Sequence, residues 1–250
     1  MQKSILMNVL VIGGSGVVGT LVVPILAETH TIRVFDLRAP QYKSTEYVAG
    51  DVTDYAALLQ AAQGMDTLIY LAMGSLNWDE IPGVTSAFDV NVKGVYLALK
   101  AAHEAGIERA VYASSMSVYA DDLLKRAFYD EDVTPDAITL YGFTKRLGEE
   151  VCQQACRAWG MHINALRLCF PTAEEKWLRE TIVGTPTIAT TANDVARAML
   201  AALEFSAGFQ AFMISGDYEQ KVMKMAKAKR LLGWEPLARP TRQPETAQEG

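Results

Sequence analysis

Two stretches of the sequence with helical character place a tyrosine four residues before a lysine: Tyr141 with Lys145, and Tyr96 with Lys100. On a helix, this spacing puts both side chains on one face. A tyrosine is a poor base at its ordinary pKa of about 10, but a neighbouring ammonium group stabilises the phenolate and lowers that pKa. The phenolate can then accept a proton from a hydroxyl while hydride leaves the same carbon. Each pair is therefore a candidate for redox chemistry on an alcohol or a carbonyl.

The surroundings of Tyr141 and Lys145 favour this pair over the other. Ser114 and Ser115 close an apolar run that is typical of a strand, and the helix with Tyr141 follows them. In a parallel sheet, the carboxyl ends of the strands form the ligand crevice, so Ser115 should lie near the substrate oxygen as a hydrogen-bond donor. For the Tyr96 pair we prefer a packed aromatic ring and a solvated lysine. We therefore expect the catalytic residues to be Ser115, Tyr141 and Lys145.

A glycine-rich turn lies near the start of the chain, in the segment GGSGVVG at residues 13–19. It follows a strand pattern and opens a helical one. Glycines here let the backbone turn tightly and approach a pyrophosphate, and the helix N-terminus offers free N–H groups and a positive dipole end. A plain connection between a strand and a helix is the alternative. We expect dinucleotide contacts from Gly13, Gly16, Val17, Val18 and Gly19.

An acidic residue, Asp36, stands at the end of the second expected strand, where dinucleotide-binding proteins place a carboxylate against the adenosine ribose. A carboxylate there repels the extra phosphate of NADP, so NAD is favoured, although the nearby Arg38 softens this preference. After the third strand, Asp51 can meet the adenine amino group, and small residues after the fourth strand let the backbone pass close to the cofactor. Further contacts are expected from Leu37, Arg38, Val52, Leu71, Ala72 and Met73.

Strand and helix patterns alternate through the chain, and these elements must position the candidate residues. Apolar runs rich in β-formers predict strands at residues 5–12, 31–35, 46–48, 67–72, 109–113, 163–168 and 211–214. Helical patterns lie at residues 17–28, 55–62, 85–105, 140–159, 193–203 and 221–232. Such alternation predicts an α/β fold, a Rossmann-type doubly wound parallel sheet with a small C-terminal substrate-binding lobe.

The chain is expected to divide into three parts. Residues 1–168 should form the dinucleotide-binding domain with the catalytic residues, and residues 169–238 a small substrate lobe interleaved with the last sheet elements. Residues 239–250 are polar and contain two prolines, which is typical of a disordered tail.

Composition and charge exclude several classes of partner. The formal net charge is −6, and no run of lysine and arginine is present in the sequence, so nucleic acid and anionic membranes are not expected as partners. No apolar stretch is long enough to span a bilayer. Three cysteines cannot pair completely, and the three histidines form no metal-spaced cluster. We expect a cytoplasmic protein that binds a small-molecule substrate and no metal.

Together these motifs resemble the extended short-chain dehydrogenase/reductase family, also called NAD-dependent epimerases/dehydratases, over residues 8–235. The resemblance rests on the glycine turn, the acidic Asp36, and the segments GDVTD, LAMG, NVKG, YASSMSVY, YGFTK, NDVA and KRLLGWEP. It implies that Ser115 is catalytic, that Tyr141 is the acid/base, and that Lys145 binds the cofactor ribose and tunes the pKa of Tyr141. It also implies that Tyr141 lies against the cofactor, that Asn91 supports the sheet and the cofactor region, and that two helices pair across a two-fold axis in a homodimer.

The C-terminal region is shorter than that of the sugar-nucleotide enzymes in this family. A short region with Cys-Phe-Pro after the sixth strand is also similar to the uronate dehydrogenases, in which an arginine beyond this tripeptide binds the sugar carboxylate. Arg179 is the candidate for that role here, and a solvated surface position is the alternative. We expect substrate contacts from Ser75, Ser115, Met116 and Arg179.

Three functions are compatible with the sequence. The first is an NAD-dependent oxidoreductase acting on a sugar or a sugar-like hydroxyl or carbonyl compound. The second is a nucleotide-sugar epimerase or dehydratase that recycles bound NAD in each turnover. The third is a non-catalytic dinucleotide-binding regulator, which would be expected to have lost Tyr141 or Lys145, and both are present here.

Overall fold

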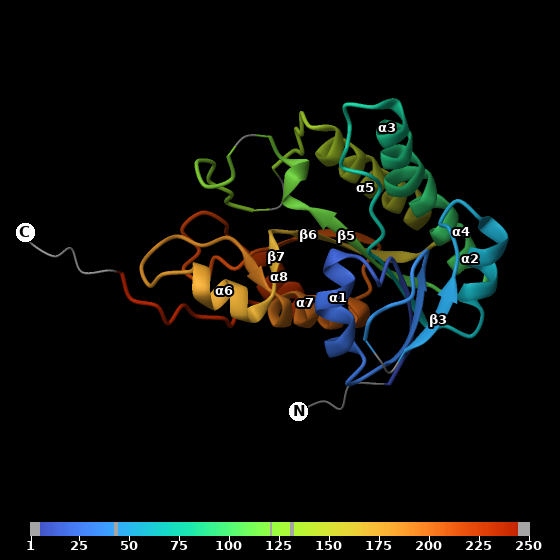
Figure 1. The fold of residues 1–250 in the computed structure, drawn as a ribbon, viewed down its shortest axis with the longest axis horizontal. Coiled ribbons are helices and arrows are strands. Elements are labelled where there is room, and N and C mark those ends of the chain that lie inside the picture. Colours follow the sequence, from blue (N-terminus) through green and yellow to red (C-terminus); the bar gives the residue numbers. More distant parts are fainter. Residues whose placement is uncertain (1–5, 43–44, 121, 131–132, 245–250) are drawn as a thin grey trace, which may run out of the picture.

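A seven-stranded parallel sheet forms the centre of the computed structural model, which describes residues 6–42, 45–120, 122–130 and 133–244 (Figure 1). Its strands are β1 (Asn8–Ile12), β2 (Thr31–Asp36), β3 (Glu46–Ala49), β4 (Thr67–Tyr70), β5 (Arg109–Ser115), β6 (His162–Leu168) and β9 (Phe209–Ile214). They lie in the order β3-β2-β1-β4-β5-β6-β9, and every neighbouring pair is parallel. The winding reverses between β1 and β4, the place where doubly wound sheets bind ligands. The predicted Rossmann-type fold is confirmed.

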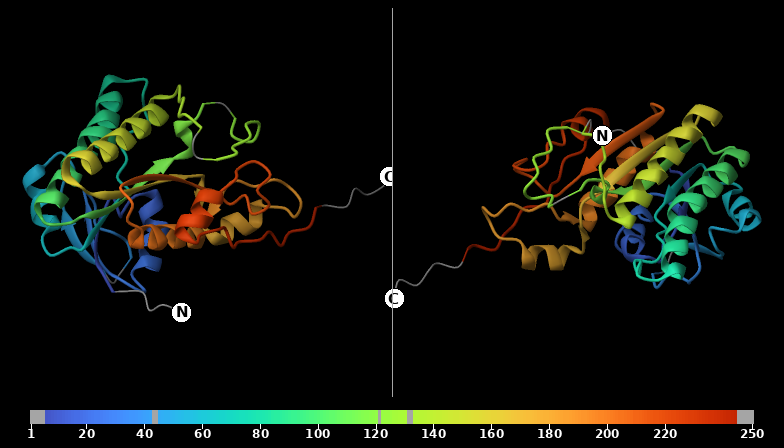
Figure 2. Two further views of the ribbon diagram at one scale, coloured as in Figure 1. Left: turned by 180° about the vertical axis from the view of Figure 1, so that it is seen from behind. Right: turned by 90° about the horizontal axis from the view of Figure 1, so that it is seen from above.

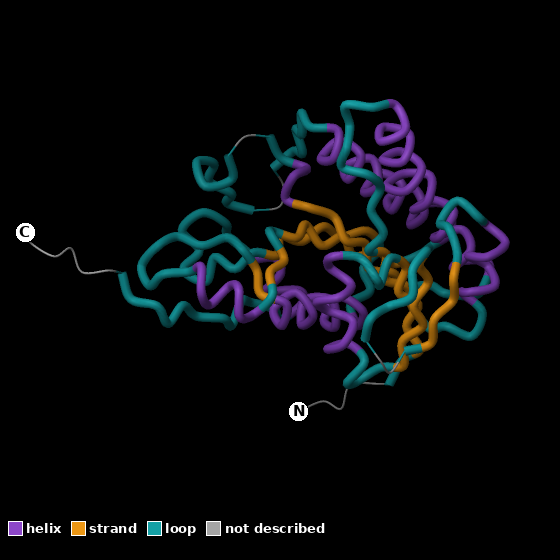
Figure 3. The backbone as a smooth tube through the Cα atoms, viewed as in Figure 1, coloured by secondary structure: helices purple, strands orange, loops and turns teal. Residues whose placement is uncertain are grey.

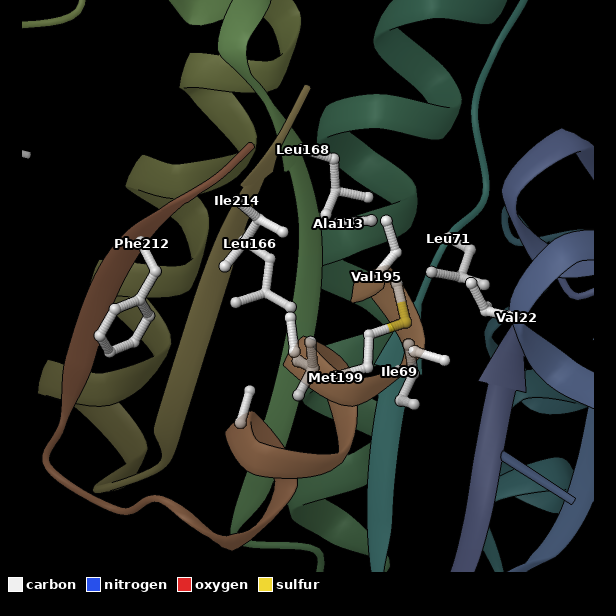
Figure 4. Close-up of a cluster of buried hydrophobic side chains, with 14 of the residues drawn as sticks. Val22, Ile69, Leu71, Ala113, Leu166, Leu168, Val195, Met199, Phe212 and Ile214 are labelled. Carbon is white, nitrogen blue, oxygen red and sulfur yellow. The ribbon is translucent and has the colours of Figure 1, made fainter. Parts of the chain in front are cut away.

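Helices cover both faces of the sheet, because successive side chains of each strand point to opposite sides. One face is covered by α1 (Val17–Leu26), α7 (Ala192–Glu204) and α8 (Ala226–Leu232). Figure 4 shows part of this core, in which Val22 of α1 and Met199 of α7 lie against apolar side chains of the strands. The other face is covered by α2 (Tyr55–Ala62), α4 (Val95–Glu104) and α5 (Leu140–Trp159). The two cores hold the strands rigidly, so their carboxyl ends are fixed points for a site.

Beyond β6 the chain builds a small lobe at the end of the molecule away from β3 (Figure 2). It contains α6 (Glu174–Glu180) and a two-stranded parallel sheet of β7 (Pro171–Thr172) and β8 (Thr190–Thr191). Between Tyr119 and Thr139, the described parts of the chain are mostly loop (Figure 3), and Phe128 is bridged there to Met223. These segments border the carboxyl end of β5.

The helix expected at residues 85–105 is divided in the structure. Its first part, α3 (Ile81–Phe88), begins earlier than expected, because Pro82 fits the first turn, where a missing N–H is tolerated. A π-helical segment (Asp89–Gly94) follows and leads into α4. The sequence pattern could not reveal this break, since the apolar spacing of a single wider turn is almost the same as that of an α-helix.

The end of the chain also differs from expectation. The helix expected at residues 221–232 begins only at Ala226, since Met223 is bridged to Phe128 instead. In the expected tail, Arg242 is bridged to Ile182, and the Arg242 carbonyl accepts a 2.9 Å hydrogen bond from the Val183 N–H. Residues 245–250 of that tail, and residue 5 of the first expected strand, lie outside the described residues.

Candidate functional site

A cavity of about 580 Å³ opens at the carboxyl ends of β1, β2, β4, β5 and β6. It spans the switch point between β1 and β4, and it runs from the glycine turn to the lobe. Most of the residues predicted from the sequence line it: Gly13, Gly16, Val17, Val18, Asp36, Leu37, Arg38, Asp51, Val52, Leu71, Ala72, Met73, Ser115, Met116, Tyr141 and Lys145.

The glycine turn forms one wall of this cavity by close backbone packing. Gly13 has a φ of +84°, and a Cβ there would lie 2.3 Å from the backbone nitrogen of Ala72. Gly16 begins α1 with no side chain capping the helix, so the first N–H groups of α1 face the cavity without a built-in acceptor. A dinucleotide pyrophosphate fits this wall, because an anion can approach the backbone and the positive end of the helix dipole.

Gly19, another predicted residue of the turn, does not line the cavity. A Cβ at Gly19 would lie 2.1 Å from the carbonyl oxygen of Gly14. The missing side chain lets α1 pack directly on the turn, so Gly19 holds the turn in place from behind.

The carboxylate of Asp36 is fixed at the end of β2, beside the glycine turn. It accepts backbone hydrogen bonds from Ser15 at 3.0 Å and from Arg38 at 3.1 Å. The Ser15 hydroxyl donates to the carbonyl of Arg38 at 2.7 Å, which closes the link between turn and strand. A negative charge therefore stands where an adenosine ribose would lie, and the exposed Arg38 side chain is next to it.

Asn91 acts behind the cavity and does not line it. Its side chain is buried in the π-helical segment, where its oxygen accepts from the Gly74 N–H and its nitrogen donates to the Thr144 hydroxyl, each at 3.0 Å. Asn91 therefore ties the segment after β4 to α5. A π-helical turn at such a position is a frequent feature of functional sites.

Ser115, Tyr141 and Lys145 meet at the inner end of the cavity. The Ser115 hydroxyl lies close enough to the Tyr141 hydroxyl to lower its pKa, and Ser115 Oγ accepts from the Ser117 N–H at 3.0 Å. Lys145 Nζ donates to the carbonyl oxygen of Ala113 at 2.8 Å and lies 5.9 Å from the centre of the Tyr141 ring. A serine, a tyrosine and a lysine thus surround one point at the end of β5.

Burial controls the charges of this group. Burial raises the pKa of Tyr141, and the Ser115 hydroxyl acts in the opposite direction. Burial also lowers the pKa of Lys145 to about 8. Tyr141 therefore needs a further positive charge before it can act as a base near neutral pH, and an oxidised nicotinamide ring beside it would supply one.

Close packing of α5 on β5 sets this geometry. Thr139 caps α5 by accepting a 3.1 Å hydrogen bond from the Gly142 N–H. A Cβ at Gly142 would lie 1.9 Å from the carbonyl oxygen of Ser117, and a Cβ at Gly148 would lie 2.2 Å from the Tyr112 hydroxyl. The two glycines let the helix approach the strand, which brings Tyr141 within reach of Ser115.

Two predicted substrate residues lie outside the cavity lining. Arg179 is an exposed residue of α6, and its carbonyl accepts a hydrogen bond from Arg242 at 3.3 Å. Ser75 is half-buried, and its hydroxyl accepts from the Asn77 N–H at 3.1 Å. The Tyr96 pair also lies elsewhere, since Tyr96 packs on Trp159 and Lys100 forms an exposed ion pair with Glu104.

Several residues of the site region were missed from the sequence. The cavity lining also includes Phe35, Ser114, Ser117, Leu123, Phe170 and Pro171. Trp78 stacks on Tyr141, with ring centres 6.3 Å apart and planes 9° apart. No sequence spacing connects Trp78 with Tyr141, because tertiary folding alone brings them together.

A buried ion pair behind Lys145 was also missed. Arg167 on β6 donates to both carboxylate oxygens of Glu149 on α5, at 2.9 and 2.8 Å, and both side chains are almost fully buried. The Ser114 hydroxyl donates to the same carboxylate at 2.6 Å. Glu149 stands one helical turn after Lys145, so the helical spacing Tyr-Lys-Glu was a signal that could have found it.

A second cavity, of about 400 Å³, adjoins the first and shares Ser117, Leu123 and Phe170 with it. Its remaining lining residues come from the loop after β5, the start of α5 and the lobe. This second cavity lies on the side of Ser115 and Tyr141 that is away from the glycine turn. A substrate bound at these two residues would have room to extend into it.

The described residues contain neither a membrane-spanning helix nor a cluster of metal ligands. No helix in the described ranges is long and apolar enough to cross a membrane. No group of three or more histidine, cysteine, aspartate or glutamate side chains there could hold a metal ion.

Comparison with known proteins gives the family and the fold. A family model described as "NAD dependent epimerase/dehydratase family" matches residues 9–180. A UDP-glucose 4-epimerase from Brucella ovis, solved in complex with NAD, superposes with a TM-score of 0.77 and 20% sequence identity. That match covers 92% of this chain and 94% of the other, and at this identity it shows a common fold.

Curated relatives match part of the chain. An N-acetyl-α-D-glucosaminyl-diphospho-ditrans,octacis-undecaprenol 4-epimerase of Escherichia coli O157:H7 is 33% identical over 147 residues, which is 59% of this chain and 43% of that protein. A 3β-hydroxysteroid dehydrogenase/Δ5→4-isomerase of Mycobacterium tuberculosis strain H37Rv is 39% identical over 122 residues, 44% of this chain and 32% of that protein. The matches therefore span less than half of the length of either relative.

Proposed function

We propose a function from the premise that this chain belongs to the NAD dependent epimerase/dehydratase family, whose model spans most of its length. In this proposal the protein is an NAD-dependent oxidoreductase that acts on a hydroxyl or carbonyl group of a sugar or sugar-like small molecule. The observation that carries this proposal is the meeting of Ser115, Tyr141 and the buried Lys145 in the lining of one cavity, with Lys145 tied to the end of β5.

Each member of the group has one task in the reaction. Bound NAD would supply the hydride acceptor in oxidation and the hydride donor in reduction. Tyr141, as the phenolate, accepts the hydroxyl proton of the substrate, and Ser115 donates a hydrogen bond to the same oxygen. Lys145 stabilises the phenolate by its charge and holds the ribose, as the family resemblance implies. The glycine turn and the N-terminus of α1 bind the pyrophosphate.

The position of Asp36 supports NAD over NADP. Its carboxylate stands at the end of β2, held by the N–H groups of Ser15 and Arg38, and it would accept hydrogen bonds from the ribose hydroxyls. A phosphate on that ribose would instead meet a negative charge. The Arg38 side chain is exposed beside Asp36, and its positive charge would soften this preference.

A second candidate function is an epimerase or a dehydratase that recycles its cofactor within each turnover. The similarity to a 4-epimerase from Escherichia coli O157:H7 favours it. Such an enzyme uses the same proton transfer by Tyr141, but the hydride returns to the substrate.

An absorbance assay for NADH separates the two functions. The protein would be incubated with NAD and a panel of free aldoses, uronates and sugar nucleotides, and its cofactor content as purified would be measured. NADH accumulation with one substrate supports the oxidoreductase. Tightly bound NAD in the purified protein, with interconversion of a sugar nucleotide and no net NADH, would favour the epimerase or dehydratase.

We also propose a homodimer formed through α4 and α5. These helices pack side by side in the chain, and they expose the aromatic rings of Tyr96 and Phe143. Light scattering after size-exclusion chromatography should give twice the mass of the chain. A Phe143→Glu variant should shift the mass to that of one chain, and a dimer that survives this change would argue against α5 as the interface.

A further inference from the structure

The second cavity carries information about the chemistry of the substrate. Its walls contain large apolar side chains that are well exposed to it and to solvent: Leu124 at 51%, Ile138 at 82% and Phe170 at 62% exposed. Leu123 and Ile188 extend this surface. Large apolar side chains gathered around one opening indicate a binding site for apolar material.

This apolar surface is continuous with the catalytic group. Leu123, Phe170 and Ser117 line both cavities, and the first cavity also contains Ser115 and Tyr141. Any molecule that places a hydroxyl at Tyr141 and extends away from the glycine turn therefore lies against these side chains. The occupant of the second cavity is thus the body of the substrate.

Phe170 stands at the junction in a strained conformation. Its backbone φ is +41°, in the left-handed region that favours glycine, and its ring is mostly exposed. A bulky residue keeps such a conformation only where the surrounding structure imposes it, and such residues are concentrated at binding sites. The exposed ring between the two cavities offers a flat apolar contact to a bound molecule.

The charges around the second cavity disfavour an anion. The carboxylate of Asp122 lies in its lining. Among the described residues that line the two cavities, the cations are Arg38, at the cofactor end, and Lys145, whose ammonium is bonded to Ala113. Of the neighbouring cations, Lys125 pairs with Asp122 itself. The neighbouring Arg126 is likewise paired, with Asp136. An added carboxylate or diphosphate would therefore meet apolar walls and cations that already have acidic partners, which costs free energy.

We propose that the substrate is an uncharged secondary alcohol or ketone with an apolar body, which lies on Phe170, Leu123 and Ile138 while its oxygen meets Tyr141 and Ser115. This proposal rests on the proposed oxidoreductase function and replaces its sugar-like substrate with a less polar one, which also argues against uronates and sugar nucleotides. The reaction balances as alcohol plus NAD⁺ to ketone plus NADH plus one proton. The hydroxyl proton passes to Tyr141, and the carbon-bound hydrogen leaves as hydride.

The test compares alcohols that differ in charge and not in shape. Methylcyclohexanol and hydroxycyclohexane carboxylate share a ring and a hydroxyl, and they differ by a methyl group and a carboxylate at one ring position. Glucuronate and UDP-glucose complete the panel, and NADH formation is measured with each while NAD binding is measured by calorimetry. We expect kcat/KM for the neutral alcohol to exceed that for its carboxylate by about tenfold or more.

Two variants locate the contact. Phe170→Ala should lower kcat/KM for methylcyclohexanol by about tenfold with little change in NAD affinity, because the variant loses a ring that touches the substrate body. Tyr129→Ala is the matched control, since it removes another exposed aromatic ring that lines neither cavity, and it should leave kcat/KM unchanged. Asp122→Lys should raise kcat/KM for the carboxylate by about threefold.

The outcomes separate this proposal from the function on which it rests. NADH formation with the neutral alcohol, reduced in Phe170→Ala only, supports both. NADH formation or epimerisation with glucuronate or UDP-glucose in preference to the neutral alcohol overturns the substrate class and leaves the catalytic group in place. NAD binding without conversion of any member of the panel overturns both proposals.

Discussion

The ammonium nitrogen of Lys145 lies 2.8 Å from the carbonyl oxygen of Ala113, so a helix side chain is tied directly to the strand that ends in Ser115. This contact fixes the distance between α5 and β5 at the level of the site. It also buries a cation that has about 3% of its surface exposed. The burial of this charge affects the stability of the protein.

The buried Lys145 should make stability depend on pH. Its pKa falls from 10.5 to about 8 on folding, mainly through burial, with Cys152 and Glu149 acting in the opposite direction. The unfolded chain therefore binds one more proton between these values, so this group raises the free energy of unfolding as pH increases from about 8 to 10.5. Below pH 8 the buried ammonium is charged, and its burial lowers the free energy of unfolding by the full amount, about 3 kcal/mol.

Urea unfolding of the wild type and of Lys145→Met at pH 7 and pH 10 measures this effect. The difference between the two proteins isolates Lys145 from the buried tyrosines and cysteines, which titrate in both. We expect the free energy of unfolding of Lys145→Met, relative to that of the wild type, to be higher at pH 7 than at pH 10. An equal difference at the two pH values would show that the pKa of Lys145 is not lowered.

Replacement of Asp36 should change the choice of cofactor. Asp36→Ser removes the carboxylate that faces the expected ribose and leaves a hydroxyl able to accept from Ser15. We expect the ratio of kcat/KM for NAD over that for NADP to fall by about tenfold or more, because the repulsion of the extra phosphate is lost. Steady-state kinetics with both cofactors provide the measurement, and an unchanged ratio would place the ribose elsewhere.

The buried pair of Glu149 and Arg167 should be costly to break from one side. Glu149→Gln leaves the Arg167 guanidinium buried without its carboxylate, and we expect a loss of about 3–5 kcal/mol in the free energy of unfolding. A double variant, Glu149→Leu with Arg167→Leu, should lose less than Glu149→Gln alone. A double variant that lost as much as Glu149→Gln, or more, would contradict an uncompensated charge on Arg167 as the cause of the loss.

The local motifs of the sequence were sufficient to predict the fold class and most of the candidate cavity lining. These motifs are either local in sequence or stand at the end of a strand: the glycine turn, Asp36, and the pair of Tyr141 and Lys145. Parallel topology then brings the strand ends together, as the β3-β2-β1-β4-β5-β6-β9 order does here.

The rest of the site depends on contacts that sequence spacing does not encode. The resemblance implied that Asn91 supports the cofactor region, but its bonds to Gly74 and Thr144 lie in a π-helical segment that the apolar pattern of the helix hides. Trp78 reaches Tyr141 through an irregular loop. Arg179 was expected at the substrate by analogy, but the course of the lobe places it on the exposed side of α6.

The most direct test of the account is the comparison of Tyr141→Phe with the wild type. Phenylalanine keeps the ring that stacks on Trp78 and removes only the hydroxyl group. NADH formation with the best substrate of the panel and the Kd for NAD would be measured for both proteins. We predict a loss of kcat of roughly a hundredfold to ten-thousandfold, with the Kd changed by less than about threefold. Full activity in Tyr141→Phe would contradict the assignment of Tyr141 as the acid/base.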